Sequence, residues 1–254
     1  MIEMRRFIPN LLTLLNLLSG SVAVVLTVLV STMDDARFIN IAIAAIALGA
    51  MFDVFDGFTA RKLGVSSPLG VQLDSLADLV TFGLAPSVLY LHLQLAHVSY
   101  DFYEPKGWVV LIFVPLLLTL FSAYRLAKFN IDSEQKHYFK GLATPASALF
   151  TLGLVLAIEN GTASPWIHAI VLTPYAIPVI VVLQGLLVVS NIPMFSLKVK
   201  PFTLFNLVPH LLWLCVTVLC MIFFRWEGLA YGMLAYVILS LCFKKRIVTS
   251  TPEQ

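Results

Sequence analysis

Apolar stretches, each about as long as a membrane-spanning helix, recur from the beginning of the chain to its end. Hydrophobic residues make up 59% of the chain and charged residues only 12%, whereas soluble proteins carry about 25% charged residues. Lipid offers the backbone no hydrogen bonds, so a segment that crosses it must pair its own polar groups, as a helix does. The sequence therefore predicts an all-α polytopic membrane helix bundle. No basic stretch is interleaved with aromatic residues, so we expect no nucleic acid partner.

Positive charge suggests how these segments are oriented. We place about eight transmembrane helices along the chain, at 10–31, 38–58, 68–91, 108–128, 141–159, 166–190, 205–224 and 228–243. If the N-terminus is cytoplasmic, all of the 16 lysines and arginines except Arg37, Lys106 and Arg225 lie on the cytoplasmic side. Such an excess marks the cytoplasmic face. We therefore expect a multi-pass protein of the cytoplasmic (inner) membrane with both termini in the cytoplasm.

The chain has no composition typical of a separate soluble domain. We expect one membrane domain over residues 1–254, made of a core at 1–200 and an additional C-terminal helix pair at 201–254. Ser67 followed by Pro68 predicts a helix start, because serine caps free N–H groups and proline suits the first turn. Pro174 and Pro178 should kink the segment at 166–190.

Four aspartates lie within or beside two of the apolar segments: Asp53 and Asp56 in one, Asp74 and Asp78 in the next. Ionisable groups at membrane depth are costly and usually functional. Spacings of three and four residues place each pair on one helical face. A short turn around 65–67 makes the two helices antiparallel neighbours, so we expect the four carboxylates to converge just inside the cytoplasmic surface.

Converging carboxylates repel one another unless cations lie between them. Oxygen-only ligands suit hard cations, and pairs of such ions are typical of sites that catalyse displacement at phosphorus. We therefore predict two divalent cations, Mg²⁺ or Mn²⁺. A divalent-cation transporter is the non-enzyme alternative, since carboxylates in membrane spans also mark ion paths. It would need neither Arg61 beside the acids nor all four acids near one surface.

The acidic segments resemble the signature of the CDP-alcohol phosphotransferase family at every defined position. They read Asp53-x-x-Asp56-Gly57-x-x-Ala60-Arg61 and, after eight residues, Gly70-x-x-x-Asp74-x-x-x-Asp78. The family transfers a phosphatidyl or similar group from a CDP-linked donor to an alcohol and releases CMP. The resemblance implies that Asp53, Asp56, Asp74 and Asp78 bind the metals and that Asp78 is also the general base. It further implies CDP contacts at Gly57, Ala60, Arg61 and Gly70, and a homodimer.

The small residues and the arginine of this signature suit such a ligand physically. Gly57, Ala60 and Gly70 leave room for a bulky group against the helix backbones, and Arg61 offers a fork for phosphate oxygens. Thr13 and Asn16, three residues apart in the first span, are expected to face the nucleotide. Packing between helices is the alternative role for both.

Several segments resemble the branch of the family that uses CDP-diacylglycerol and L-serine. They lie at 8–16, 73–86, 125–130, 140–146 and 190–198, and Ala143 departs from that branch, which commonly has proline there. Serine carries a carboxylate, for which the cytoplasmic end of the fourth span offers Arg125, Lys128 and Asn130. Ordinary anchoring at the positive side of the membrane is the alternative role for these residues.

We therefore expect the chain to make phosphatidylserine and CMP from CDP-diacylglycerol, a membrane lipid, and L-serine, at a site that faces the cytoplasm. Choline, glycerol phosphate or inositol as acceptor remain alternatives. Choline would need an aromatic cage, for which Tyr124 and Phe129 are available. Glycerol phosphate would need a denser basic cluster for its phosphate.

Overall fold

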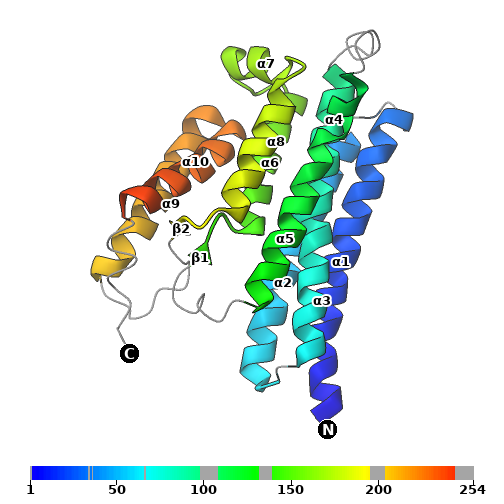
Figure 1. The fold of residues 1–254 in the computed structure, drawn as a ribbon, viewed down its shortest axis with the longest axis vertical. Coiled ribbons are helices and arrows are strands. Elements are labelled where there is room, and N and C mark those ends of the chain that lie inside the picture. Colours follow the sequence, from blue (N-terminus) through cyan, green and yellow to red (C-terminus); the bar gives the residue numbers. More distant parts are fainter. Residues whose placement is uncertain are drawn as a thin grey trace.

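The structure is a computed structural model that describes residues 2–33, 35, 37–65, 67–97, 108–131, 139–194 and 204–243. Nearly all of these residues are helical, which confirms the all-α class (Figure 1). The helices are α1 (Ile2–Met33), α2 (Arg37–Leu63), α3 (Pro68–Asp78), η1 (Leu79–Leu84), α4 (Ala85–His97), η4 (Trp108–Leu116), α5 (Leu117–Ile131), α6 (Thr144–Glu159), α7 (Pro165–Val171), α8 (Ala176–Val189), α9 (Leu204–Phe224) and α10 (Glu227–Cys242). Two short strands, β1 (Phe139–Lys140) and β2 (Pro193–Met194), pair antiparallel.

Several helices are suited to a membrane, as expected. Four are long and apolar enough to cross it, at Phe7–Val30, Arg37–Leu63, Pro68–His97 and Val109–Ile131. The number rises to five if the bent pair α7 and α8 forms one span, and α6, α10 and the Val208–Phe224 part of α9 are shorter apolar helices. The chain is therefore a membrane protein by the length and composition of its helices. The count of eight spans stays a prediction, as does the cytoplasmic side of the termini, since residues 1 and 244–254 lie outside the described part.

The segment at 166–190 is more than kinked. Helix α7 ends at Val171, α8 begins at Ala176, and the two axes meet at 91°. Pro174 lies at this break, in agreement with the expected disruption. Pro178 lies in the first turn of α8, where its missing N–H breaks no helical hydrogen bond. The second kink that we expected at Pro178 is therefore absent, because the helix starts just before that residue.

A widened turn joins α3 to α4. Residues Leu79–Leu84 form the π-helix η1, directly after Asp78. Thr81 in this turn donates its hydroxyl to the carbonyl of Asn16 at 3.0 Å. A Cβ added to Gly49 of α2 would lie 2.7 Å from Thr81 Cγ2, so the helices approach closely only because glycine is present. π-Turns often occur at functional sites, and this one fixes α3 against α1 and α2.

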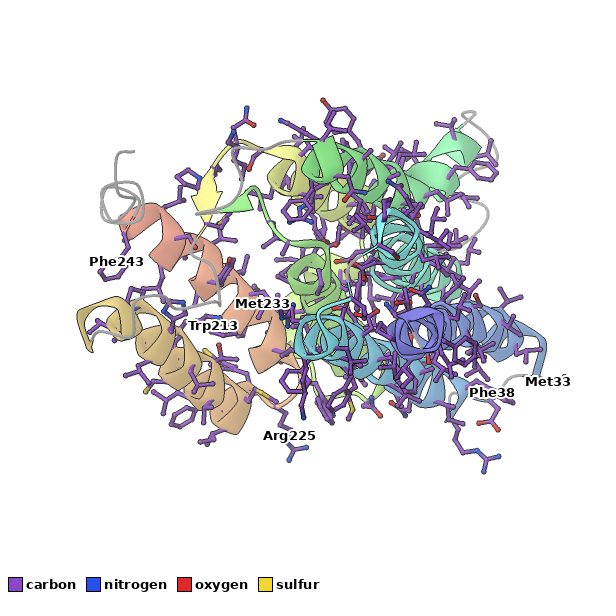
Figure 2. The ribbon with its side chains drawn as sticks, turned by 90° about the horizontal axis from the view of Figure 1, so that it is seen from below. Met33, Phe38, Trp213, Arg225, Met233 and Phe243 are labelled. Atoms are coloured by element: carbon purple, nitrogen blue, oxygen red, sulfur yellow. The ribbon has the colours of Figure 1, made fainter. Side chains whose placement is uncertain are left out.

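The main hydrophobic core lies in the half of the bundle away from the α2–α3 turn. Most of its buried side chains come from α1, α2, α4, α6 and α8, among them Ile39, Leu89 and Val155, and η1, α5 and α7 supply one each. The α9–α10 hairpin packs on α6 at one side of the molecule, away from α1 (Figure 1). Trp213 of α9 lies between the two helices of the hairpin and Arg225 lies at its turn (Figure 2). The indole N–H of Trp213 donates to the carbonyl of Gly232 on α10 at 2.9 Å.

Candidate active site

Helices α2 and α3 run side by side and are joined at one end of the bundle (Figure 1), and carboxylates from both helices meet toward that end. One carboxylate oxygen from each of Asp53, Asp56 and Asp74 lies within 4.8 Å of the others. The side chain of Asp53 also contacts that of Asp78. The structure thus brings all four aspartates into one cluster, with Asp53 between Asp74 and Asp78.

Local chemistry at the α2–α3 turn explains this convergence. Gly64 has a φ of 63°, and the N–H of Val65 donates to the carbonyl of Ala60 at 3.0 Å. The N–H of Gly64 donates to the carbonyl of Arg61, which completes a Schellman motif at the end of α2. Ser67 then caps α3 as predicted, since its hydroxyl accepts from the N–H of Gly70 at 3.0 Å. The chain reverses within a few residues, so the two acidic faces lie side by side.

Helix α1 supplies polar partners for two of the acids. The hydroxyl of Thr13 donates to Asp56 Oδ2 at 2.5 Å. The amide of Asn16 donates to Asp78 Oδ1 at 3.3 Å, and Asn16 is fully buried. Thr13 and Asn16, which are three residues apart on one face of α1, therefore bind acids from two different helices. These partners orient the carboxylates, but they carry no positive charge to balance them.

A cavity of about 130 Å³ adjoins the cluster on the side of the α2–α3 turn. Its walls come from α1, α2, α3 and the turn, and they consist of Pro9, Asn10, Thr13, Asp56, Gly57, Ala60, Val65, Ser67, Gly70, Val71 and Asp74. Three of the expected CDP contacts, Gly57, Ala60 and Gly70, line this cavity. Arg61 folds back over Gly57, so that a Cβ added to this glycine would lie 3.2 Å from Arg61 Nη1. Asn16, also expected to contact CDP, is not among these wall residues and donates to Asp78; its contact with CDP stays a prediction.

Asn10 is a wall residue that the sequence did not single out. A Cβ added to Gly70 would lie 3.3 Å from Asn10 Oδ1, so the asparagine packs directly against the glycine in the cavity wall. The only signal in the sequence was its place in the segment at 8–16 that carries part of the family resemblance. Its helical face could not be assigned before the partner helices of α1 were known.

A sequence model described as CDP-alcohol phosphatidyltransferase matches residues 6–223. This chain belongs to the CDP-alcohol phosphatidyltransferase family. The matched region contains the acidic cluster and the cavity, and it ends before α10 begins at Glu227.

Members of this family that resemble the chain are named CDP-diacylglycerol–serine O-phosphatidyltransferase. The protein from Mycobacterium leprae is 35% identical over 164 residues, which are 60% of this chain and 48% of that protein. The one from Bacillus subtilis is 32% identical over 166 residues, 65% of this chain and 81% of that protein. The one from Saccharomyces cerevisiae is 31% identical over 159 residues, 59% of this chain and 59% of that protein. The chain thus spans about half the length of the Mycobacterium leprae relative.

The three residues expected to bind serine differ in their position. Arg125 of α5 is 8% exposed, and its guanidinium interacts electrostatically with Asp78. Lys128 is at the surface and donates to Asn191 Oδ1 at 3.0 Å, while Asn130 donates to Ser75 Oγ at 2.8 Å. Arg125 is therefore buried in the bundle, within electrostatic range of the acidic cluster. Lys128 and Asn130 lie at the surface of the bundle and connect α5 to the segment after α8 and to α3.

Proposed function

We propose that this chain transfers the phosphatidyl group of CDP-diacylglycerol to the hydroxyl of L-serine and releases phosphatidylserine and CMP. The observation that carries this proposal is the buried Arg125 within electrostatic range of Asp78 in the acidic cluster, in a family of CDP-alcohol phosphatidyltransferases. A fixed cation suits an acceptor with a carboxylate. The names of the relatives support the same acceptor.

The donor set of the acidic cluster fits a hard divalent cation. Asp74 Oδ1 is buried and has no hydrogen-bond partner among the described residues, which is costly for an acceptor unless a cation binds it. We propose that Asp53, Asp56, Asp74 and Asp78 hold two divalent cations, Mg²⁺ or Mn²⁺. When bound, these ions would balance the charge of the diphosphate and polarise the bond to the departing CMP.

The protein groups around the cavity would bind and orient the donor. Gly57, Ala60 and Gly70 leave the helix backbones uncovered, so the CDP moiety can lie against them. Arg61, folded over Gly57, lies where its guanidinium can bind phosphate oxygens. Thr13 holds Asp56 by a hydrogen bond and so keeps its second oxygen directed toward the cluster. The acyl chains of the donor would remain in the bilayer.

Asp78 would act as the general base. Asn16 holds its Oδ1, which fixes the orientation of the carboxylate. The serine hydroxyl gives its proton to Asp78 while a bond forms between the serine oxygen and phosphorus, and the bond from phosphorus to the CMP oxygen breaks. Arg125 would hold the carboxylate of serine near Asp78, so that the hydroxyl reaches the donor in a reactive orientation.

We propose that the site faces the cytoplasm from within the inner membrane. Arg61 and Lys62 in the last turn of α2 lie at the same end of the bundle as the acids, and positive charge favours the cytoplasmic side. A soluble acceptor such as serine would enter there. A homodimer is proposed from the family resemblance alone.

Release of CMP by the purified protein tests this proposal. The protein is incubated with CDP-diacylglycerol and Mg²⁺ or Mn²⁺, and with L-serine, choline, glycerol 3-phosphate or inositol in separate reactions. We expect release that depends on serine and is lost when a chelator is added. Release with another acceptor only would overturn the serine assignment and keep the chemistry of the acidic cluster.

The same preparation tests the two alternatives that the sequence left open. Tyr124 is 61% exposed, whereas Phe129 lies against the guanidinium of Arg125 at 5.9 Å, so the two rings do not support a choline cage. A divalent-cation transporter would give metal flux in sealed vesicles and no CMP release with any acceptor. CMP release with choline but not with serine, or metal flux without CMP release, would contradict the proposed function.

A further inference from the structure

A second cavity lies beside the C-terminal hairpin, which is on the side of the molecule away from α1 (Figure 1). Its volume is about 220 Å³, and it shares no described wall residue with the cavity at the α2–α3 turn. The walls come from α6 and the segment before it, from α8 and from α10. They consist of Leu142, Phe150, Ile180, Leu183, Gln184, Leu187, Met233, Leu234 and Val237.

These wall residues form a groove that follows the helices. On α8 they lie between Ile180 and Leu187 at spacings of three, one and three residues, which places them on one stripe. The helix rises about 10 Å over this distance. Met233 and Val237, four residues apart, form a second stripe on α10. A narrow space with this direction has the shape of an extended hydrocarbon chain.

The groove is apolar throughout its described walls. Gln184 alone among them has a polar side chain, and its amide is engaged elsewhere. Its Oε1 accepts from the hydroxyl of Tyr90 at 2.8 Å, and its Nε2 donates to Ser147 Oγ at 2.7 Å and to Thr151 Oγ1 at 3.1 Å. Cavities lined in this way stay dry and take apolar molecules. An unfilled space would also lose dispersion contacts along its walls. Hydrocarbon is therefore the chemistry that fits.

The rims of the groove are accessible to lipid. Leu183 of α8 and Leu234 of α10 are 57% and 45% exposed, whereas Leu142 and Met233 are buried. The α7–α8 pair is apolar enough for one span and α10 is an apolar helix, so these exposed leucines face the hydrocarbon of the bilayer. A helix is about 10 Å wide with its side chains, so a second copy of the chain would cover the groove without filling it. A single acyl chain can enter.

The protein itself keeps the groove in place. A Cβ added to Gly153 of α6 would lie 2.7 Å from the backbone nitrogen of Ala230, so α10 is held directly against α6 at this point. The N–H of Leu142 donates to the carbonyl of Leu187 at 3.0 Å, which joins two wall residues near the C-terminal end of α8. A preformed groove binds its ligand without the cost of ordering its own walls.

We propose that this groove binds one acyl chain of a bilayer phospholipid, and that the bound chain links the C-terminal hairpin to α8. The phospholipid is a structural ligand and not the donor, since the groove and the proposed donor cavity share no described wall residue. One wall is α10, which begins after residue 223, where the family match ends.

The test is the binding of dioleoylphosphatidylglycerol to the purified full chain in detergent, counted by native mass spectrometry. Leu183→Trp fills the groove from its rim. Leu186→Trp is the matched control, because Leu186 is 52% exposed on the same helix and is not a wall residue. Each buried methylene group contributes about fourfold to affinity. An indole that displaces two of them should therefore weaken the tightest lipid binding by more than about tenfold.

Leu234→Trp repeats the experiment from α10 and should give the same loss, with the helix content of both variants unchanged by circular dichroism. Leu186→Trp should bind the lipid as the wild type does. Equal binding by wild type and Leu183→Trp, or an equal loss in Leu186→Trp, would overturn the inference.

Two further results would assign the groove to another occupant and so overturn the inference. A higher KM for CDP-diacylglycerol in Leu183→Trp, with unchanged phosphatidylglycerol binding, would assign it to the donor. A change of oligomeric state in light scattering, again with unchanged lipid binding, would assign it to a second copy of the chain. Lipid binding is measured without turnover, so this test is decided independently of the proposed function.

Discussion

The bundle carries a polar cluster at each end, and the two clusters are built differently. At one end Asp53, Asp56 and Asp74 approach within 4.8 Å, with Asp78 beside Asp53. At the other end Glu159 of α6 lies between two imidazoles of α4, 3.3 Å from His97 Nε2 and 3.4 Å from His92 Nε2. The continuous segment Pro68–His97 contributes to both, so one long helical unit carries acids at its first end and histidines at its second.

The difference lies in whether the protein supplies complementary groups. Glu159 has an imidazole nitrogen from each of His92 and His97 within 3.4 Å, so the single acid of the histidine cluster lies against nitrogen groups that the protein itself supplies. Among the described residues, the aspartates have a hydroxyl and an amide from α1 as hydrogen-bond donors. Positive charge reaches them only through the electrostatic influence of Arg61 on Asp56 and of Arg125 on Asp78, and no cation forms an ion pair with them. A site of like charges is stable only if ions or protons are added. The comparison therefore predicts catalysis at the acidic end and structural support at the histidine end.

The largest expected effect is that of Asp78→Asn. The amide keeps the shape of the side chain, but it cannot accept the proton of the serine hydroxyl, and loss of a general base costs about 10²–10⁴-fold in rate. CMP release per mole of enzyme and the Tm measure the effect on activity and folding. Glu159→Gln makes the same chemical change at the other end and is the control, with turnover expected to stay near wild type. Normal turnover by Asp78→Asn would refute the assigned role.

Metal binding should stabilise only one of the two clusters. At a Mn²⁺ concentration of about 100 times Kd, binding to the folded state alone adds about 2.7 kcal/mol to the free energy of unfolding. We expect the Tm of the wild type and of Glu159→Gln to rise on addition of Mn²⁺ and to fall again with a chelator. Asp74→Asn removes an oxygen ligand and should lose most of this rise. An equal rise in Asp74→Asn would show that the ion binds elsewhere.

The local part of the acidic site could be predicted from the sequence. The helix start at Ser67 and Pro68 and the common face of Asp74 and Asp78 depend on residues a few positions apart. The short turn between α2 and α3 makes these helices antiparallel neighbours, so their two acidic faces meet at similar depth. Helical spacing and capping chemistry were sufficient for these features, because no distant partner alters them.

Features that depend on distant segments could not be predicted. Thr13 and Asn16 were expected to face the nucleotide, and Thr13 does line the cavity. Their hydrogen-bond partners Asp56 and Asp78 come from later helices, and only the packing of α1 decides these pairings. The 91° bend before α8 exceeds what a proline alone indicates.

The histidine cluster of Glu159, His92 and His97 should matter for stability rather than for turnover. Glu159→Gln removes the carboxylate charge that lies 3.4 Å from His92 Nε2 and 3.3 Å from His97 Nε2, and loss of an interaction with a charged group at such a site costs about 1–3 kcal/mol. We expect a lower Tm in detergent, with kcat and KM close to wild type. The matched measurement is the thermal unfolding of both proteins under identical conditions. A strong loss of CMP release at unchanged stability would mean that the two ends of the bundle are functionally coupled.

The smallest effect is expected for Asp35→Asn, which breaks an ion pair at the surface between α1 and α2. Asp35 accepts from Arg37 Nη2 at 2.7 Å, and this hydrogen bond lowers the pKa of the Asp35 carboxyl below its usual value. Because the pKa is lowered in the folded protein, any stabilisation is present above the unfolded pKa and is lost as the pH falls through the folded one. At neutral pH the pair is complete, yet exposed ion pairs contribute little, so the Tm of Asp35→Asn should equal that of the wild type. A decrease in Tm as large as that of Glu159→Gln would contradict the view that burial, more than charge pairing, makes the histidine cluster stabilising.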